Sequence, residues 1–250
     1  MLTTFILKLI AMVTMTIDHV GLIMMANSTF YTPMRVVGRI AFLLYAFLVA
    51  EGFFHIRERP GRTRNQIIKL TVLTIVSEVA YDLMEHGVWF YPSDQSVMPT
   101  LLLGFVGLAV MEKFKWEPAA VATCCGGFSL LSLFIHSNYR FAGVLLIYAF
   151  YAFTSSCRDM SFGRRFVVLS VIITAYWLLH VWVRVDFGDM RMFMAEMRNV
   201  GAWAIGHYLA MILVAAYDGR QGLKNKAFDL LYSAYYPLHM LAIWGIGLLH

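Results

Sequence analysis

Residues 5–27 read FILKLIAMVTMTIDHVGLIMMAN, an apolar run that is long enough to cross a lipid bilayer. At 1.5 Å of rise per residue, about 20 residues span a hydrocarbon core about 30 Å thick. The run is too long for a secretory leader, carries Asp18 and His19 inside it and lacks a small-residue cleavage site, so we expect it to stay in the mature protein. Similar runs recur to the end of the chain, and they decide the fold class.

The composition of the whole chain agrees with that interpretation. Of the 250 residues, 60% are hydrophobic and 14% are charged, and the mean hydropathy is +0.68. Soluble domains have about 45–50% apolar and about 25% charged residues, so these charges are too few to cover a water-facing surface. We predict a single all-α transmembrane domain over residues 1–250. Its spans, about nine of them, are expected at residues 5–27, 34–56, 66–84, 97–113, 118–136, 140–155, 165–184, 200–217 and 229–249.

Basic residues are concentrated in alternate loops, which predicts the orientation in the membrane. By the positive-inside rule these loops are cytoplasmic, so the N-terminus is expected inside and the C-terminus outside. The intervening loops hold few cations and more aromatic residues, as expected for an interfacial belt. The cations of the basic loops are Arg57, Arg59, Arg62, Arg64, Lys69, Lys113, Lys115, Arg158, Arg164, Arg165, Arg220, Lys224 and Lys226.

The net charge of +5 does not indicate a nucleic-acid partner, because the cations are scattered over short loops. Cys124 and Cys125 are adjacent in an apolar run and Cys157 lies beside a basic turn, so neither a disulfide framework nor a metal motif is implied. We therefore expect membrane lipids around the chain, and neither nucleic acid nor a metal. The sequence does not determine the oligomeric state.

An amphipathic segment separates the seventh and eighth expected spans. Its apolar side chains share one arc at 100° per residue, with Asp189 and Glu196 opposite, which favours an outward-facing interfacial helix or a packed connector. The apolar residues are Phe187, Met190, Phe193, Met194 and Met197.

Ionisable side chains inside the spans are candidates for function, because a charge near the bilayer centre costs at least about 2.5–3.5 kcal/mol. In the first span, Lys8 and His19 lie about 20° apart around a helix and about 16 Å apart along it, so they share a face. In the second span, Arg35 and Arg39 are one turn apart, with Arg39 at a depth similar to that of His19.

Two further spans contribute to the same expected polar layer. Glu78 and Asp82 are one turn apart in the third span, and His239 lies near the middle of the last span, a turn after Tyr235 and Tyr236. Pairing that merely holds helices together is the alternative, and for the two carboxylates it is equally favoured. His180 and His207 are interpreted as packing or interfacial residues, and Glu51 as the partner of a loop cation.

Four stretches carry a family resemblance: Lys8 to His19 (KLIAMVTMTIDH), Gly38 to Phe53 (GRIAFLLYAFLVAEGF), Ser77 to Asp82 (SEVAYD) and Tyr236 to His239 (YPLH). They resemble the TraX family, known for pilin N-acetylation. The chain departs from relatives at Leu43, where they commonly carry proline, and at Asp218, where many have asparagine. Supporting segments are residues 100–104, residues 139–146 and the YDGRQG stretch at residues 217–222.

This family looks like a branch of the transmembrane acyltransferases that include the acyltransferase-3 enzymes, whose spacing of a basic residue and a histidine is repeated by Lys8 and His19. The resemblance implies transfer of an acyl group, usually acetyl, from cytoplasmic acyl-CoA to an acceptor at or across the bacterial inner membrane. The acceptor would be an amine or hydroxyl of a peptide, glycan or lipid. His19 would be catalytic, with Asp18, Arg39 and His239 at the other polar motif positions.

General chemistry fits these roles. An acceptor that attacks a thioester must lose a proton, which suits His19, and the developing oxyanion needs fixed positive charge, which suits Arg39. Asp18 lies 100° around the helix from His19, so we expect it to orient a neighbouring group. A transient acyl-His19 intermediate is the alternative. Candidate residues for binding CoA or the acceptor are Lys8, Arg35, Glu78, Asp82 and Tyr235.

The loop from Arg57 to Lys69 is the densest positive loop and could dock the CoA phosphates, although topology alone also explains it. Two other functional classes remain open. The first is a proton-coupled transporter or channel with a buried His, Asp and Glu relay, and the second is a structural assembly subunit. Consumption of acyl-CoA separates the three classes, because only an acyltransferase would consume it.

Overall fold

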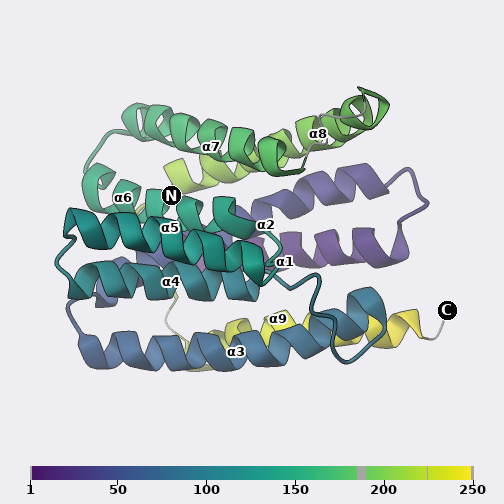
Figure 1. Cartoon of the computed structure of the whole chain (residues 1–250), viewed down its shortest axis with the longest axis horizontal. Coiled ribbons are helices and arrows are strands. Elements are labelled where there is room, and N and C mark those ends of the chain that lie inside the picture. Colours follow the sequence, from purple (N-terminus) through teal and green to yellow (C-terminus); the bar gives the residue numbers. More distant parts are fainter. Residues whose placement is uncertain (1, 185–189, 224, 249–250) are drawn as a thin grey trace. The chain divides into compact units, whose positions relative to one another are not determined.

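The computed structural model describes residues 2–184, 190–223 and 225–248, and at residues 183, 184, 190–196 and 198–200 it gives the backbone alone. In this part of the chain the structure is all-helical, without a β-strand (Figure 1). Each expected span corresponds to one helix. The helices are α1 (Thr4–Met24), α2 (Tyr31–Ile56), α3 (Pro60–His86), α4 (Met98–Lys113), α5 (Pro118–Phe134), α6 (Arg140–Cys157), α7 (Phe162–Arg184), α8 (Met190–Ala215) and α9 (Lys226–Gly247).

Two helices, α3 and α8, begin well before the predicted spans, whereas the other helix starts lie close to the predicted ones. α3 begins at Pro60, because proline is well suited to the first turn of a helix, where its missing N–H has no helical partner. α8 begins at Met190 and continues without a break into the expected span at residues 200–217. The predicted amphipathic arc lies outside the described side chains, except for Met197.

Four helices are long and apolar enough to cross a membrane, which supports the predicted membrane helical class. α5 and residues Gly201–Ala215 of α8 are apolar but shorter. Nine crossings therefore remain a prediction. The four helical segments that meet the length and composition criteria are Thr4–Met24, Tyr31–Ile56, Arg140–Cys157 and Phe162–Trp182.

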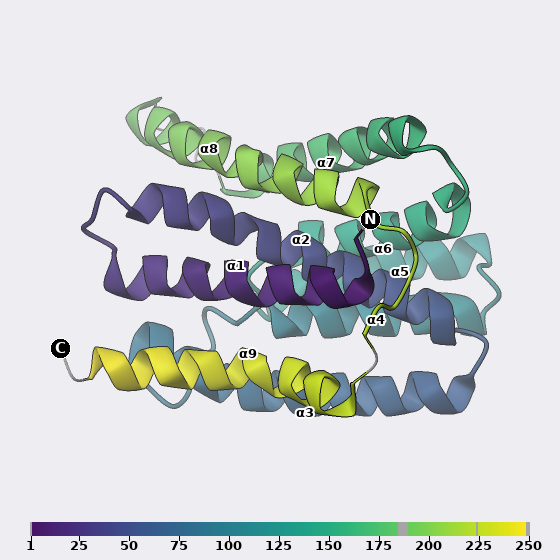
Figure 2. The ribbon, with the colours of Figure 1, turned by 180° about the vertical axis from the view of Figure 1, so that it is seen from behind.

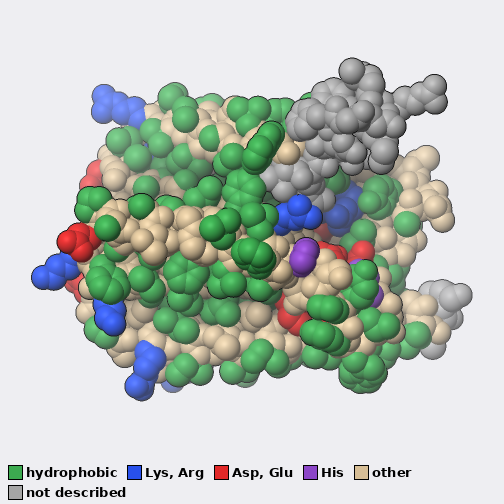
Figure 3. Space-filling model, in the orientation of Figure 1, with side chains coloured by type: hydrophobic (Ala, Val, Ile, Leu, Met, Phe, Trp, Pro, Cys, Tyr) green, Lys and Arg blue, Asp and Glu red, His purple; other side chains and the backbone are tan. Residues whose placement is uncertain are grey.

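The outward-facing surface is rich in apolar side chains, and several ionic side chains are buried. Figure 3 shows apolar side chains over much of the visible face. Arg39, Glu51 and Asp82 are each less than 5% exposed. This distribution is the one expected where the surrounding solvent is lipid rather than water. On α3 alone the exposed apolar stripe consists of Ile68, Val72, Ile75, Val76 and Val79.

The contacts divide the chain into two compact units, whereas the sequence predicted a single domain; the latter remains a prediction. The first unit comprises Met1–Tyr45 and Asp159–Lys224, and the second comprises Ala46–Arg158 and Asn225–His250. Within the first unit α1 lies beside the N-terminal part of α2, and α7 lies beside α8 (Figures 1 and 2). Within the second unit α9 lies beside α3, and α4 contacts α3, α5 and α6.

Backbone contacts tie the start of α1 to the YDGRQG stretch in the first unit. The N–H groups of Thr4 and Phe5 donate to the carbonyls of Arg220 and Gln221, at 2.9 and 3.1 Å. Gly222 has a φ of 74°, and a Cβ there would lie 2.5 Å from the Thr3 hydroxyl oxygen. A glycine is therefore required at this position, both by its left-handed backbone and by the close approach.

Small residues allow the helices of the first unit to approach closely. A Cβ on Gly38 of α2 would lie 1.9 Å from a carboxylate oxygen of Asp18 on α1. A Cβ on Gly206 of α8 would lie 2.1 Å from the carbonyl oxygen of Val36 and 2.9 Å from the Cβ of Arg39. α2 is thus in close contact with α1 on one side and with α8 on another, as small residues permit between membrane helices.

Replacing each of the two glycines of α2 with alanine should change the stability of the protein in different ways. Gly38→Ala has no space for its methyl group, so it should lower the unfolding temperature markedly. Gly52→Ala meets nothing within 4 Å, so it should be neutral or stabilising by up to about 1 kcal/mol through helix propensity. Thermal unfolding of both variants in detergent, followed by circular dichroism, checks this. Equal unfolding temperatures would contradict the close contact at Gly38.

Candidate functional site

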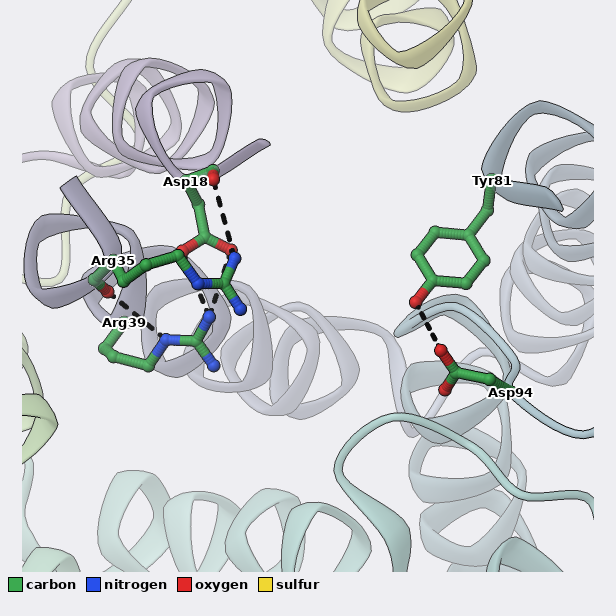
Figure 4. Close-up of polar contacts among 5 residues, drawn as sticks. All are labelled: Asp18, Arg35, Arg39, Tyr81 and Asp94. Atoms are coloured by element: carbon green, nitrogen blue, oxygen red, sulfur yellow. Dashed lines mark hydrogen bonds and ion pairs between the residues drawn. The ribbon is translucent and has the colours of Figure 1, made fainter. Parts of the chain in front are cut away.

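One carboxylate holds two arginines in the first unit (Figure 4). Oδ2 of Asp18 on α1 accepts a hydrogen bond from Nη1 of Arg35 at 2.8 Å. Nη2 of Arg39 donates to both carboxylate oxygens of Asp18, at 3.0 and 3.1 Å. Because Arg35 and Arg39 are one turn apart on α2, both reach the same group on the neighbouring helix. We call these three residues the ion cluster.

The ion cluster is largely buried, and its geometry is fixed from several sides. Side-chain exposure is 13% for Asp18, 12% for Arg35 and 3% for Arg39. Nε of Arg39 donates to the carbonyl oxygen of Arg35 at 3.3 Å, and its guanidinium carbon lies 5.0 Å from the ring centre of Trp203 on α8. The planar Arg39 side chain therefore contacts a carboxylate, a backbone carbonyl and an aromatic face, an arrangement that lysine cannot reproduce.

His19 follows Asp18 directly and is 8% exposed. The carboxylate of Asp18 is used by arginines of the next helix, in agreement with the expectation that it orients a neighbouring group. Lys8 is half-buried on the same helix, α1. The structure thus brings Asp18, Arg35 and Arg39 together beside the position of His19, and the catalytic and binding roles of these residues remain predictions.

His207 of α8 is a buried residue to which the sequence gave little weight. It is fully buried, and neither ring nitrogen has a hydrogen-bond partner among the described residues. Its ring lies 5.3 Å from that of Tyr176 and 6.3 Å from that of His180, both on α7. Gly206 before it packs against the Cβ of Arg39. Sequence carried no signal for this placement, because it depends on which helix α8 contacts.

In the second unit, Glu78 and Asp82 bind the segment that joins α3 to α4. Glu78 accepts hydrogen bonds from the backbone N–H and the hydroxyl of Ser96, at 3.0 and 2.5 Å. Asp82 accepts from the backbone N–H of Tyr91 at 2.8 Å. The two carboxylates thus hold a loop, a role that neither of the alternatives raised by the sequence included. Direct contact with a substrate remains a prediction for both.

The same segment is held at a further point by a tyrosine that sequence did not single out. The hydroxyl of Tyr81 on α3 donates to Oδ2 of Asp94 at 2.9 Å (Figure 4). The ring of His86 lies 4.1 Å from that of Tyr91 in the same loop. Contacts from α3 therefore fix the loop along its length.

A hydrogen bond of His239 in α9 defines which of its ring nitrogens carries the proton. Its Nδ1 lies 2.9 Å from the carbonyl oxygen of Tyr235, and a carbonyl only accepts, so Nδ1 carries the proton. In the neutral ring Nε2 is then the nitrogen with the lone pair. The ring stacks on Tyr235 at 5.1 Å with planes 10° apart, and His239 is 7% exposed. This geometry suits a group that takes up a proton.

The expected polar layer includes residues from both units. His19 and Arg39 lie in the first, and Glu78, Tyr235 and His239 lie in the second. Each set has the burial expected of it within its own unit. That they share one layer remains a prediction.

Comparison with known proteins agrees with the motifs around the ion cluster. The sequence model of the family described as TraX protein matches residues 4–247, which is nearly the whole chain. The chain belongs to the TraX family. This membership confirms the resemblance inferred from the motifs around His19, Arg39 and His239.

Beyond the TraX family model, a curated relative is the probable fimbrial assembly protein FimC, serogroup H1, of Dichelobacter nodosus. It is 27% identical over 116 residues, which cover 43% of this chain and 46% of the relative. The chain therefore matches less than half the length of that protein. No solved structure matches the chain.

Breaking the ion cluster should destabilise the protein. Asp18→Asn leaves Arg35 and Arg39 buried without their carboxylate, and removing one partner of a buried ion pair costs about 3–5 kcal/mol. We expect a large drop in the free energy of unfolding, measured by denaturant titration in mixed micelles. Asp159→Asn, at an exposed position after α6, is the control and should behave like wild type. Equal losses in the two variants would contradict the pairing.

His207→Phe should unfold at an equal or higher temperature than wild type. The substitution replaces a buried ring that has unbonded nitrogens with an apolar ring of similar shape, and such nitrogens each cost about 1–3 kcal/mol when unsatisfied. Thermal unfolding in detergent measures the effect. A fall of several degrees would show instead that the imidazole makes a stabilising polar interaction in the membrane.

Proposed function

We propose that the chain is an integral membrane acyltransferase of pilus or fimbria assembly. It moves an acyl group, most simply acetyl, from cytoplasmic acyl-CoA to an amine or hydroxyl at or beyond the membrane. Membership of the TraX family and the name of the fimbrial relative support the assembly context. The proposal includes about nine crossings of the bacterial inner membrane, with the N-terminus inside and the C-terminus outside.

The observation that carries the proposal is the ion cluster next to His19. Two guanidinium groups and one carboxylate are held at 2.8–3.1 Å in a largely buried position, so the three side chains together carry more positive than negative charge. Fixed positive charge in a place of low polarity stabilises an oxyanion far more than it would in water. His19 adds a proton acceptor at the adjacent position of the chain.

The chemistry needs only these groups and the two substrates. The acceptor nitrogen or oxygen attacks the thioester carbonyl carbon, while His19 takes the proton that the acceptor loses. The carbonyl oxygen becomes an oxyanion, which Arg39 stabilises. As the oxyanion collapses, the C–S bond breaks, and the protonated His19 returns its proton to the leaving CoA thiolate. His239, with its lone pair on Nε2, positions the acceptor or relays its proton.

Different observations bear on the roles of the remaining predicted binding residues. Arg35 is engaged with Asp18, and its role is to fix the ion cluster. The contacts of Glu78 and Asp82 support a loop-positioning role in acceptor binding. Lys8 supplies positive charge for the donor, and Tyr235 packs against His239.

The test compares two histidine variants in inverted membrane vesicles of the native host, supplied with acetyl-CoA labelled in its acetyl carbon. His19→Asn keeps a polar side chain but removes the proton acceptor, so transfer of label to membrane or pilus material should fall about 10²–10⁴-fold. His136→Asn is the control, because His136 is exposed in a left-handed turn that asparagine tolerates. It should transfer label as wild type does.

Transfer by His19→Asn at the wild-type rate would overturn the proposal. So would wild-type vesicles that consume no acetyl-CoA while purified protein moves a solute or protons across liposomes.

A further inference from the structure

Two arginines from distant parts of the sequence meet beside one aromatic ring in the second unit. The guanidinium carbon of Arg57, just after α2, lies 4.3 Å from the ring centre of Phe54. The guanidinium carbon of Arg158, just after α6, lies 5.5 Å from the same centre. The structure therefore places both cations within 5.5 Å of the centre of one aromatic ring, at the ends of two helices.

An aromatic wall fixes the position of Arg57. Its Nη1 donates to the hydroxyl of Tyr151 at 3.0 Å, and Tyr151 stacks on Trp116 with ring centres 4.7 Å apart and planes 7° apart. The indole N–H of Trp116 donates to Glu112 at 2.8 Å. This wall is rigid, because a buried tyrosine, a stacked indole and a carboxylate hold one another in place.

The turn that presents Trp116 is in an unfavourable backbone conformation. Lys115 and Trp116 have φ values of 50° and 58°, and the left-handed region costs about 1–2 kcal/mol for each non-glycine residue. Neighbouring contacts must offset this cost, and strained backbone of this kind is concentrated at binding and catalytic sites.

A buried carboxylate positions the second arginine. Oε1 of Glu51 lies 3.1 Å from Nε2 of His55 and 3.9 Å from Nη2 of Arg158, and the Glu51 side chain is 6% exposed. Side-chain exposure is 28% for Arg57 and 37% for Arg158. Both guanidinium groups are thus supported from the protein side and partly open on the other.

We propose that Arg57 and Arg158, with Phe54 and Trp116, form a binding site for a phosphate ester. Glu58 lies 3.9 Å from Nε of Arg57 and Glu51 lies 3.9 Å from Nη2 of Arg158, so carboxylates partly balance the two cations beside Phe54. An anion with several oxygens on a tetrahedral centre would add hydrogen bonds from both planar guanidinium groups. The half-buried rings of Phe54 and Trp116 suit a ligand that has a flat or apolar part next to its phosphate. If the ligand is coenzyme A, this site rests on the proposed function as its donor-binding site; binding of the phosphate itself does not depend on His19.

Two sources carry this chemistry, a soluble phosphate ester and the headgroup of an anionic phospholipid. Free coenzyme A, without an acyl group, is the probe for the first, in equilibrium dialysis against full-length protein in phosphatidylcholine nanodiscs. The probe for the second is phosphatidylglycerol retained on the protein in native mass spectrometry, after purification from mixed vesicles of phosphatidylcholine and phosphatidylglycerol.

The test variants are Arg57→Gln, Arg158→Gln and the double variant. The control is Lys226→Gln, which removes one positive charge from an exposed position at the start of α9, in the same unit and outside the Arg57 to Lys69 loop. We expect each single variant to weaken binding of at least one probe about tenfold, with the control unchanged. Loss of coenzyme A binding assigns the soluble source, and loss of phosphatidylglycerol assigns the lipid. His19→Asn should bind both probes as wild type does, so failure of the acyltransferase proposal would leave this result intact.

Three outcomes would overturn the site: wild-type protein that binds neither probe, a double variant that binds both as wild type does, or a Lys226→Gln loss as large as that of Arg57→Gln.

Discussion

The pairing of Asp18 with Arg35 and Arg39 is the interaction on which the first unit depends. A charge among apolar helices is tolerable only when it is paired and hydrogen-bonded, because the lipid outside offers no solvation. The position of α1 against α2 is thereby specified, since a rotation of either helix would separate the carboxylate from both arginines. The close contacts at Gly38 and Gly206 support this arrangement, because a larger residue at either position would push a helix away from the ion cluster.

The second unit uses its ionic groups in another way. Glu78, Tyr81 and Asp82 of α3 bind the loop between α3 and α4 rather than a neighbouring helix. Helix contacts there are made by small residues instead: Gly104 and Gly107 of α4 face Ile147 and Tyr148 of α6 without room for a Cβ. The two units thus solve the same problem, polar groups in an apolar environment, with an ion cluster in one and a bound loop in the other.

The sequence predicted the helices well because long apolar runs, of the length that a bilayer-spanning helix needs, stand out between shorter polar loops. It was weaker at α3 and α8, whose first turns are polar or lie in a mixed segment. For the site, periodicity was enough to place Arg35 and Arg39 on one face of a helix. Periodicity within a helix does not reveal which helices are neighbours, so the contacts of Glu78 with Ser96 and the burial of His207 beside Tyr176 were not foreseen.

Leu43 has a mechanical consequence. It is fully buried in α2, which is helical from Tyr31 to Ile56 and contributes residues to both units. A proline at this position would remove the N–H that bonds to the carbonyl of Arg39 one turn earlier and would create a hinge. With leucine the hydrogen bonds of α2 continue without a break past this position, so the helix resists bending there.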